Sequence, residues 1–348
     1  MIGIVGDVNL TDGYFDTGFG VGSAVAAGAD PFAGINRKEG DIWIGNFEGV
    51  TARVSSKKGI YGKQFIVSPE YLAGITHFDF YNIANNHTMQ HGRVAFDEML
   101  GHLTSFGSCY FGTCKRRSVE FVYKGKRFAI TGFSQRKENF EKNPLYWYNP
   151  EYVEIEAELA KYAHLDFKIA YVHWGNEFID RPYVDQIHFA HFLIDIGYDL
   201  VVGMHPHLLQ GYEIYQGKYI FYSIGNFVFN MHWEPLRYAA IVKLDVEEEK
   251  IVTDVDYVYI GDDYFPIIIA EEDVPAAYRF SYLNTLIGHH MSNEEYYSLL
   301  RERVRRYRKD NRMIILKNIT KFKFSYVCAI VKDFATGYTM QKSMMYSK

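Results

Sequence analysis

The chain has 348 residues, is 48% hydrophobic and 23% charged, and carries a net charge of −5. This composition is typical of ordinary soluble proteins, and the length leaves room for one large domain of roughly 250 residues with an appendage. No stretch reaches the roughly 18 apolar residues of a membrane span, which argues against a chain that crosses the bilayer.

Cysteine usage and the N-terminus indicate the compartment. Three cysteines without a zinc-finger spacing favour a reducing environment. The first residues enter a strand directly, without the basic and apolar regions of a signal peptide. We therefore expect a cytoplasmic protein.

Charge is distributed unevenly along the chain. Residues 301–348 hold 13 Lys and Arg against 3 Asp and Glu, a charge of +10, which leaves −15 for residues 1–300. A basic tail on an acidic body indicates contact with something anionic, such as a membrane surface, a nucleic acid or a polyanionic product.

Polar side chains follow the first three predicted strands at the point where each strand ends. Residues 2–5 are a short apolar run closed by Gly6 and Asp7, the pattern of a buried strand that delivers a carboxylate. Residues 41–45 predict a second strand, followed by Glu48. Residues 78–84 predict a third strand, which ends in Asn85-Asn86-His87.

Helices are predicted between the strands, and a hairpin interrupts them. The predicted helices span residues 69–75, 95–106, 151–162 and 184–196. Residues 119–123 and 128–133 predict a hairpin. Residues 135–150 have no clear period, and we interpret them as an insertion near the mouth of a site.

Two further strands end in histidines. Residues 167–172 predict a buried strand that ends in His173-Trp174-Gly175-Asn176-Glu177. The apolar run 200–202 stops at Gly203, and His205 and His207 follow with only Pro206 between them. Because Gly203 and Pro206 break the pleat, both rings can turn toward one point and offer a metal two nitrogen ligands. The alternative is two unrelated surface histidines.

The alternation of strands and helices, with polar groups at the carboxyl ends of strands, predicts a layered α/β fold. Residues 239–246 and 250–260 predict a hairpin that closes the sheet on one side. Residues 294–309 predict a basic amphipathic helix with Tyr297, Leu300, Val304 and Tyr307 on one face. This helix is either docked on the body with a solvated face or binds a membrane or partner.

The strand ends together supply the groups of a metal centre. They are Asp7, Glu48, Asn86, His87, His173, His205 and His207. A shared carboxylate and several imidazoles can hold two cations, which bind a phosphoryl group and lower the pKa of a water molecule. His87, next to a candidate ligand, suits a general acid that protonates a leaving alkoxide. Each residue alone has a structural explanation, as a turn, a cap or a core histidine.

Several short motifs resemble the bacterial capsule-synthesis CapA (PgsA-like) family. They run in order across about residues 1–245: G-D-V-N-L at Gly6, N-F-E at Asn46, A-N-N-H-T-M-Q-H-G at Ala84, H-W-G-N-E at His173, H-P-H-L-L-Q-G at His205 and Y-S-I-G-N-F-V-F at Tyr222. The resemblance implies a calcineurin-like metallophosphatase-type fold, with central sheets flanked by helices, and a role in making surface polymers such as polyglutamate or capsular polysaccharide. It covers residues 1–262 as one domain and leaves residues 263–348 as a mostly helical, basic appendage.

Carried over by position, the resemblance implies two cation sites that share Glu48. One would take Asp7, Glu48 and His207, and the other Glu48, Asn86, His173 and His205. Mixed oxygen and nitrogen ligands suit one or two ions of Mn, Fe or Zn. Two departures stand out, because Asn9 occupies the position of a first-block histidine and Gln90 that of an aspartate. Substrate-side positions are Asn9, Asn85, Trp174, Glu177 and Asn226.

Two functions are compatible with these residues. The first is a metal-dependent hydrolase that cleaves a phosphoester in a surface-polymer intermediate or phosphorylated glycan, with His87 as acid. The alternative is a non-catalytic component that binds a polymer or assembles a membrane-associated synthesis complex. The missing first-block histidine and the basic tail favour the alternative. Residues 294–348 are expected to contact the inner membrane face peripherally, no nucleic-acid partner is expected, and the oligomeric state is left open.

Overall fold

The computed structural model describes residues 1–74, 77–248, 250–289 and 291–335. Strands make up two main sheets. The larger sheet contains β1 (Ile2–Val8), β2 (Ile42–Phe47), β5 (Phe80–Asn82), β6 (Cys109–Phe111), β13 (Asn226–Val228), β14 (Tyr238–Glu247), β15 (Lys250–Ile260) and β16 (Pro266–Ile269). The second contains β7 (Ser118–Tyr123), β8 (Lys126–Ser134), β9 (Phe167–His173), β10 (Leu200–Met204), β11 (Tyr212–Tyr215) and β12 (Lys218–Phe221).

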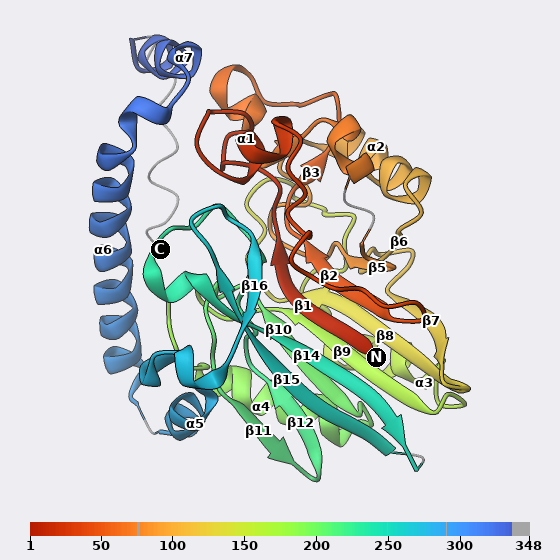
Figure 1. Cartoon of the computed structure of the whole chain (residues 1–348). Helices are drawn as coiled ribbons and strands as arrows, with labels where there is room; N and C mark the ends of the chain where they lie inside the picture. The colour runs from red at the N-terminus through yellow and green to blue at the C-terminus, as the bar shows by residue number, and fades with distance from the viewer. Residues whose placement is uncertain (75–76, 249, 290, 336–348) are drawn as a thin grey trace.

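Helices lie outside the sheets, and a small strand pair joins two loops. The α-helices are α1 (Val21–Ala26), α2 (Arg93–Ser105), α3 (Tyr152–Ala160), α4 (Val184–Asp195), α5 (Phe280–Leu283), α6 (Asn293–Lys317) and α7 (Phe324–Ala335). The loop pair is β3 (Val50–Thr51) with β4 (Ile66–Val67). Helix α6 runs along one side of the molecule and α7 lies at its end (Figure 1).

The strand order explains why several strand ends meet. The larger sheet has the order β16-β15-β14-β1-β2-β5-β6, with β13 also pairing β1, and β1, β2, β5 and β6 run parallel. The second sheet has the order β11-β12-β10-β9-β8-β7, and β8, β9, β10 and β12 run parallel. Parallel strands place their carboxyl ends along one edge, which is where open α/β sheets bind ligands.

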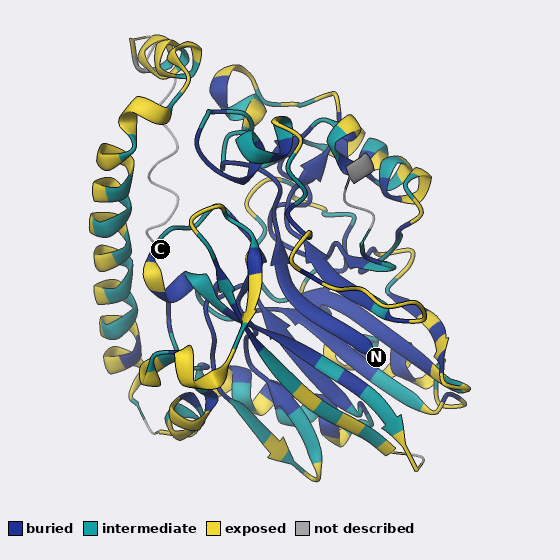
Figure 2. Cartoon of the chain, in the orientation of Figure 1, coloured by how far each residue is buried: buried dark blue, intermediate teal, exposed yellow. Residues whose placement is uncertain are grey.

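Alternating side chains hold the layers together. In β9, Ile169 and Tyr171 join an apolar cluster shared by the two sheets, whereas Ala170 and Val172 join the cluster beneath α3 and α4. The same alternation in β1 sends Ile4 between the sheets and Val5 toward the outer cluster that includes α2. The central strands are accordingly buried, whereas α6 and α7 are largely exposed (Figure 2). The predicted layered α/β fold, with central sheets flanked by helices, is confirmed.

The structure corrects several predicted elements. Residues 69–75 were expected to form an α-helix, but Pro69–Gly74 is a 3₁₀ helix and residue 75 lies outside the described residues. The helix predicted at 294–309 extends to Lys317. Its inward side carries Tyr296, which is 3% exposed, whereas Tyr297 is 43% exposed. The boundary at residue 262 stays a prediction, and β16, just beyond it, pairs with β15.

Candidate metal centre

Carboxylates and imidazoles from both sheets meet at the carboxyl ends of the parallel strands. Asp7 lies in β1, Glu48 directly follows β2, and His173 ends β9. Ligand-type atoms of these three residues lie within 4.8 Å of one another, and so do those of Glu48, His205 and His207. Glu48 belongs to both groups, as expected of a shared carboxylate. His207 also lies beside Asp7, so the assignment of each histidine to one of the two ions stays a prediction.

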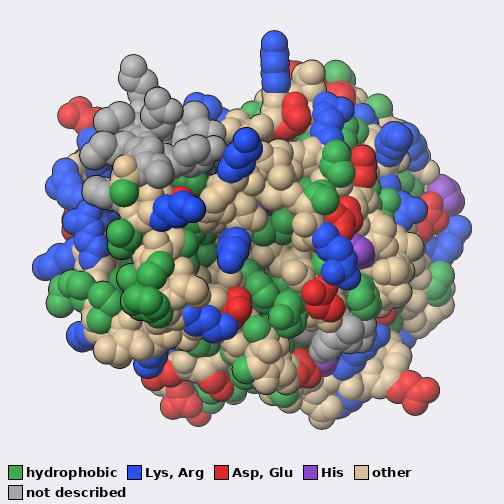
Figure 3. Space-filling view, turned by 90° about the horizontal axis from the view of Figure 1, so that it is seen from above, with side chains coloured by type: hydrophobic (Ala, Val, Ile, Leu, Met, Phe, Trp, Pro, Cys, Tyr) green, Lys and Arg blue, Asp and Glu red, His purple; other side chains and the backbone are tan. Residues whose placement is uncertain are grey.

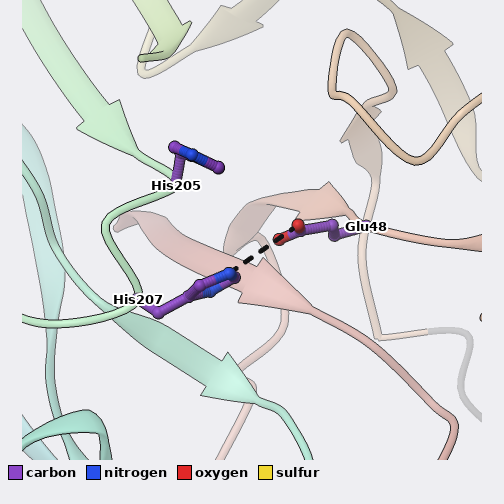
Figure 4. A group of neighbouring side chains, drawn as sticks. All are labelled: Glu48, His205 and His207. Carbon is purple, nitrogen blue, oxygen red and sulfur yellow. Dashed lines mark ion pairs between the residues drawn. The ribbon is translucent and has the colours of Figure 1, made fainter. Parts of the chain in front are cut away.

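A sharp turn after β10 aims two imidazoles at one point. His205 and His207 both adopt left-handed backbone conformations, with φ of 98° and 63°, which non-glycine residues seldom do. Their rings approach Glu48 from the same loop (Figure 4). Gly203 is required just before the turn, because a Cβ there would lie 2.2 Å from Trp174 Nε1 and 2.3 Å from the Tyr222 carbonyl oxygen. The prediction that both rings face one point is confirmed.

Two buried side chains at the centre lack hydrogen-bond partners. Both carboxylate oxygens of Glu48 and both ring nitrogens of His205 are buried without one. Such groups are rare in folded proteins, because desolvating an unpaired polar atom costs about 1–3 kcal/mol and a charged one more. A divalent cation would satisfy both residues, since it accepts lone pairs from carboxylates and neutral imidazoles. The donor set therefore fits a metal.

The neighbouring groups form a continuous network. Asn86 Oδ1 lies 2.7 Å from His173 Nε2, and Asn46 Nδ2 donates to Asp7 Oδ1 at 2.8 Å. His207 Nδ1 lies 3.3 Å from Asp7 Oδ2, and its Nε2 lies 3.9 Å from Glu48 Oε1. All six predicted ligands thus lie in one buried cluster.

Burial and charge set the protonation states in the metal-free protein. Burial lowers the pKa of His173 to about 3 and that of His205 well below its usual value, so both rings are neutral and can ligate. Burial opposes charge on His207, but the carboxylates of Glu48 and Asp7 raise its pKa to about 10. Burial, together with the charge of Asp7, raises the pKa of Glu48 well above its usual value.

His87 lies beside the centre rather than within it. Its Nε2 is 3.7 Å from Glu48 Oε1, and its Nδ1 is 2.6 Å from Gln90 Oε1. The Gln90 amide nitrogen faces Gln64, so the Gln90 oxygen faces His87 and Nδ1 carries the hydrogen. Phe140 belongs to the segment interpreted as an insertion near the site, and the centroid of its ring lies 6.1 Å from that of the His87 ring.

The five predicted substrate-side residues take different places. Asn226 Oδ1 lies 2.9 Å from His207 Nδ1, and Asn85 donates to the Phe47 carbonyl, so both support ligand-bearing segments. Glu177 is half-buried, and its negative charge contributes to the raised pKa values of Glu48 and His207. Trp174 is fully buried and donates to the Tyr222 carbonyl, so it is not brought to the centre.

The side chain of Asn9 is hydrogen-bonded within the protein. Its side-chain nitrogen donates to the Glu48 carbonyl at 2.6 Å, and its oxygen accepts from the Thr11 backbone and hydroxyl. Both polar atoms of this amide are therefore used away from the carboxylate of Glu48. Asn9 stands where the family resemblance places a histidine, and here it links the segments that follow β1 and β2 by hydrogen bonds.

Sequence reasoning did not select Asn46 and gave Gln90 no role. Asn46 donates to Asp7 and accepts from Asn82, which links β1, β2 and β5 at their ends. The available signal for Asn46 was its place at the end of a strand, two residues before Glu48. Gln90 orients His87, and its signal was the three-residue spacing from that histidine.

Comparison with known proteins gives the family. Residues 2–231 match the family described as bacterial capsule synthesis protein PGA_cap. The chain is 32% identical over 183 residues to the PGA biosynthesis protein CapA of Bacillus subtilis, covering 49% of this chain and 48% of that protein. It is 29% identical over 184 residues to the capsule biosynthesis protein CapA of Bacillus anthracis, covering 49% and 45%.

Each of these matches spans about half the length of the curated relative. Among solved structures, a 5′-nucleotidase from Candida albicans shows a distant likeness, with a TM-score of 0.45, 12% identity and coverage of 89% of this chain and 57% of that one. The family match extends over more than half of this chain and includes every candidate ligand. The chain belongs to the bacterial capsule synthesis protein PGA_cap family.

Proposed function

We propose that this protein is a metal-dependent hydrolase that cleaves a phosphoester bond during the biosynthesis of a bacterial surface polymer. The observation that carries the proposal is the pair of buried side chains Glu48 and His205, which lack hydrogen-bond partners inside a cluster of carboxylates and histidines. Family membership supports the biosynthetic context. A phosphorylated glycan or polymer intermediate is the substrate class that suits a centre of this composition.

The residues divide into ligands and a proton-transfer group. Asp7, Glu48, Asn86, His173, His205 and His207 would hold one or two divalent ions such as Mn, Fe or Zn. When bound, such ions neutralise phosphoryl oxygens and lower the pKa of water. Gln90 fixes His87 with Nδ1 protonated, which leaves Nε2 toward the centre. Nε2 is therefore the atom at which His87 accepts a proton and returns it to a leaving alkoxide.

The experiment separates metal retention from turnover. Metal content per chain is measured on protein purified without chelator, together with the hydrolysis of generic phosphomonoesters and phosphodiesters in Mn²⁺ or Zn²⁺. His205→Ala should lose both metal and turnover. His87→Ala should keep its metal but lose about 10²–10⁴-fold in rate. His191→Ala is the matched control, because His191 lies in α4, stacks on Tyr215 and is not a candidate ligand. This variant should keep its metal and its turnover. Equal rates in the wild type and in the His87 and His205 variants would contradict the hydrolase.

One observation favours a second candidate, a non-catalytic polymer-binding or assembly component. Asn9 stands in place of a potential imidazole ligand. Its side-chain nitrogen and oxygen are both hydrogen-bonded, to the Glu48 carbonyl and to Thr11. A centre with one ligand fewer could retain a cation for structure or recognition. Metal that is retained by the wild type and His87→Ala, with no turnover in either, would support this component and exclude the hydrolase.

A further inference from the structure

Helix α7 is docked with its apolar side outward. The side that contacts the body carries Tyr326, whose ring lies 5.9 Å from that of Tyr14, and Asp333, which accepts from the backbone nitrogen of Ile60. On the opposite side Phe324 is 81% exposed and Val331 is 62% exposed. A helix packed on its own protein normally buries its apolar side. The orientation of α7 is the reverse.

The exposed apolar side chains continue from α7 into the end of α6. We call them the apolar patch, and they are Met313, Leu316, Ile319, Phe324, Val327 and Val331. From above, hydrophobic side chains gather at the left edge of the molecule beside Lys and Arg (Figure 3). Exposed apolar side chains gathered on one part of a surface mark a site of interaction with another molecule or a membrane.

The same segment exposes several cations, and the two acidic residues nearest the patch are bound to the body. Arg305, Arg308 and Arg312 are exposed on α6, and Lys317 and Lys321 follow close to the patch. Asp310 accepts from Trp233 Nε1 of the body and Asp333 from the backbone nitrogen of Ile60, whereas Glu302, farther from the patch along α6, is exposed beside Arg306. The outer surface therefore joins apolar side chains to positive charge, whereas residues 1–300 carry −15.

We infer that the apolar patch and the cations around it dock on the surface of an anionic lipid bilayer, with α7 lying in the interface. A bilayer offers both negative headgroups and an apolar interior, which matches the two components of this surface. A second copy of the chain is disfavoured, because a symmetric contact would bring two strongly basic tails together. A soluble anionic polymer would meet the cations but leave the apolar side chains in water.

This docking would also set the orientation of the protein. The acidic body is repelled by an anionic surface while the tail is attracted, so the tail faces the bilayer. No helix among the described residues is long and apolar enough to cross a membrane, so the contact would be peripheral. Among the described residues of the tail, the contact lies at about 313–331, since the inner side of α6 packs on the body through Tyr296, Val304 and Tyr307. None of these residues belongs to the metal centre, so the inference does not depend on hydrolysis.

Vesicle co-sedimentation of the full chain tests the inference. The protein should sediment with vesicles of phosphatidylcholine containing about a third phosphatidylglycerol and stay in solution with pure phosphatidylcholine. Raising the salt from 50 to 500 mM should weaken the binding several-fold. The triple variant Phe324→Ser, Val327→Ser, Val331→Ser should bind at least about tenfold more weakly, given the free energy of burying three apolar side chains.

The matched control changes three exposed apolar side chains of the body, Val94→Ser, Val122→Ser and Ile214→Ser. This control should bind like the wild type, and the α7 variant should keep the wild-type circular dichroism spectrum because its three positions are exposed. Equal vesicle binding by the wild type and the α7 variant would overturn the inference. So would a wild type that fails to bind anionic vesicles but forms dimers in light scattering that the α7 variant abolishes, since the patch would then join two copies.

Discussion

Replacing Glu48 with glutamine separates the charge of this carboxylate from its packing. Glu48 is fully buried, neither of its oxygens has a hydrogen-bond partner, and it belongs to both groups of candidate ligands. Glutamine has nearly the same volume, so the core around it is conserved. The substitution removes the negative charge that a divalent cation needs at the point shared by the two groups.

The expected effect has opposite signs with and without metal. Without metal the buried carboxylate is unfavourable, because burial and Asp7 raise the pKa of Glu48 above its value in the unfolded chain. A carboxyl group with a raised folded pKa destabilises the protein at every pH above its unfolded pKa, so Glu48→Gln should be at least as stable as the wild type at pH 7. With metal at 100 times its dissociation constant, the wild type should gain about 2.7 kcal/mol and the variant almost nothing.

Thermal unfolding measures this difference directly. The unfolding entropy of about 2 cal/mol/K per residue gives roughly 0.7 kcal/mol per degree for a chain of this length, so the wild type should gain about 4 °C in Tm between EDTA and Mn²⁺ or Zn²⁺. Glu158→Gln is the control, because Glu158 is buried but paired with Lys161 at 2.6 Å. It should lower Tm in both conditions and keep the 4 °C increase. An equal increase in Glu48→Gln and the wild type would refute a metal centre built on Glu48.

Two further predictions concern residues beside the centre. His91 is buried, its Nε2 lies 2.6 Å from the Gln64 carbonyl oxygen, and burial lowers its pKa to about 4. Because the unfolded chain takes up the proton near pH 6.5, stability should fall as pH drops from 6.5 toward 4, by about 2 kcal/mol at pH 5 from this residue. Urea unfolding at pH 7 and pH 5 should show a loss smaller by this amount in His91→Gln, and an unchanged loss would contradict the assignment. Asn9→His should lower the free energy of unfolding by about 1–3 kcal/mol, because it removes the hydrogen bonds to the Glu48 carbonyl and from Thr11. The variant should bind no additional metal in elemental analysis, and an extra equivalent without loss of stability would show that the histidine position is still open.

Much of the fold was predictable because the strands are short and strongly apolar. A glycine or polar residue after an apolar run marks the end of a buried strand. The sequence therefore predicted that Asp7, Glu48, His173 and the two later histidines lie at strand ends. Since parallel strands align their carboxyl ends, proximity of these residues also followed. The individual contacts between side-chain atoms could not be predicted, because side-chain direction depends on loop dihedrals such as the left-handed backbone conformation of His205.

Other features depend on tertiary packing that a single sequence does not contain. Trp174 was predicted as a site residue because it follows His173 directly. Neighbouring residues of a strand point to opposite faces of the sheet, so Trp174 packs beneath α4, where Gly203 leaves room for its ring. The sequence put Tyr297 on one apolar face with Val304 and Tyr307, but the buried residue at that end of the helix is Tyr296, about 100° away from Tyr297 around the helix axis. Helix α7 was not predicted as a separate element, and no pattern in a single sequence could show that its apolar side faces outward.

Phe178 connects the tail to the histidine-bearing turn. Its backbone nitrogen donates to the carbonyl of Pro206, the residue between His205 and His207, and its ring stacks on Tyr307 of α6 at 4.1 Å. A protein shortened at residue 262 would lose α6 and expose the ring of Phe178. Such a truncation would therefore loosen the turn that presents two imidazoles, and it would lower affinity for metal at the same time as it removed the tail. Point substitutions on the outer face of α7 are the cleaner way to study the tail, because they leave this support in place.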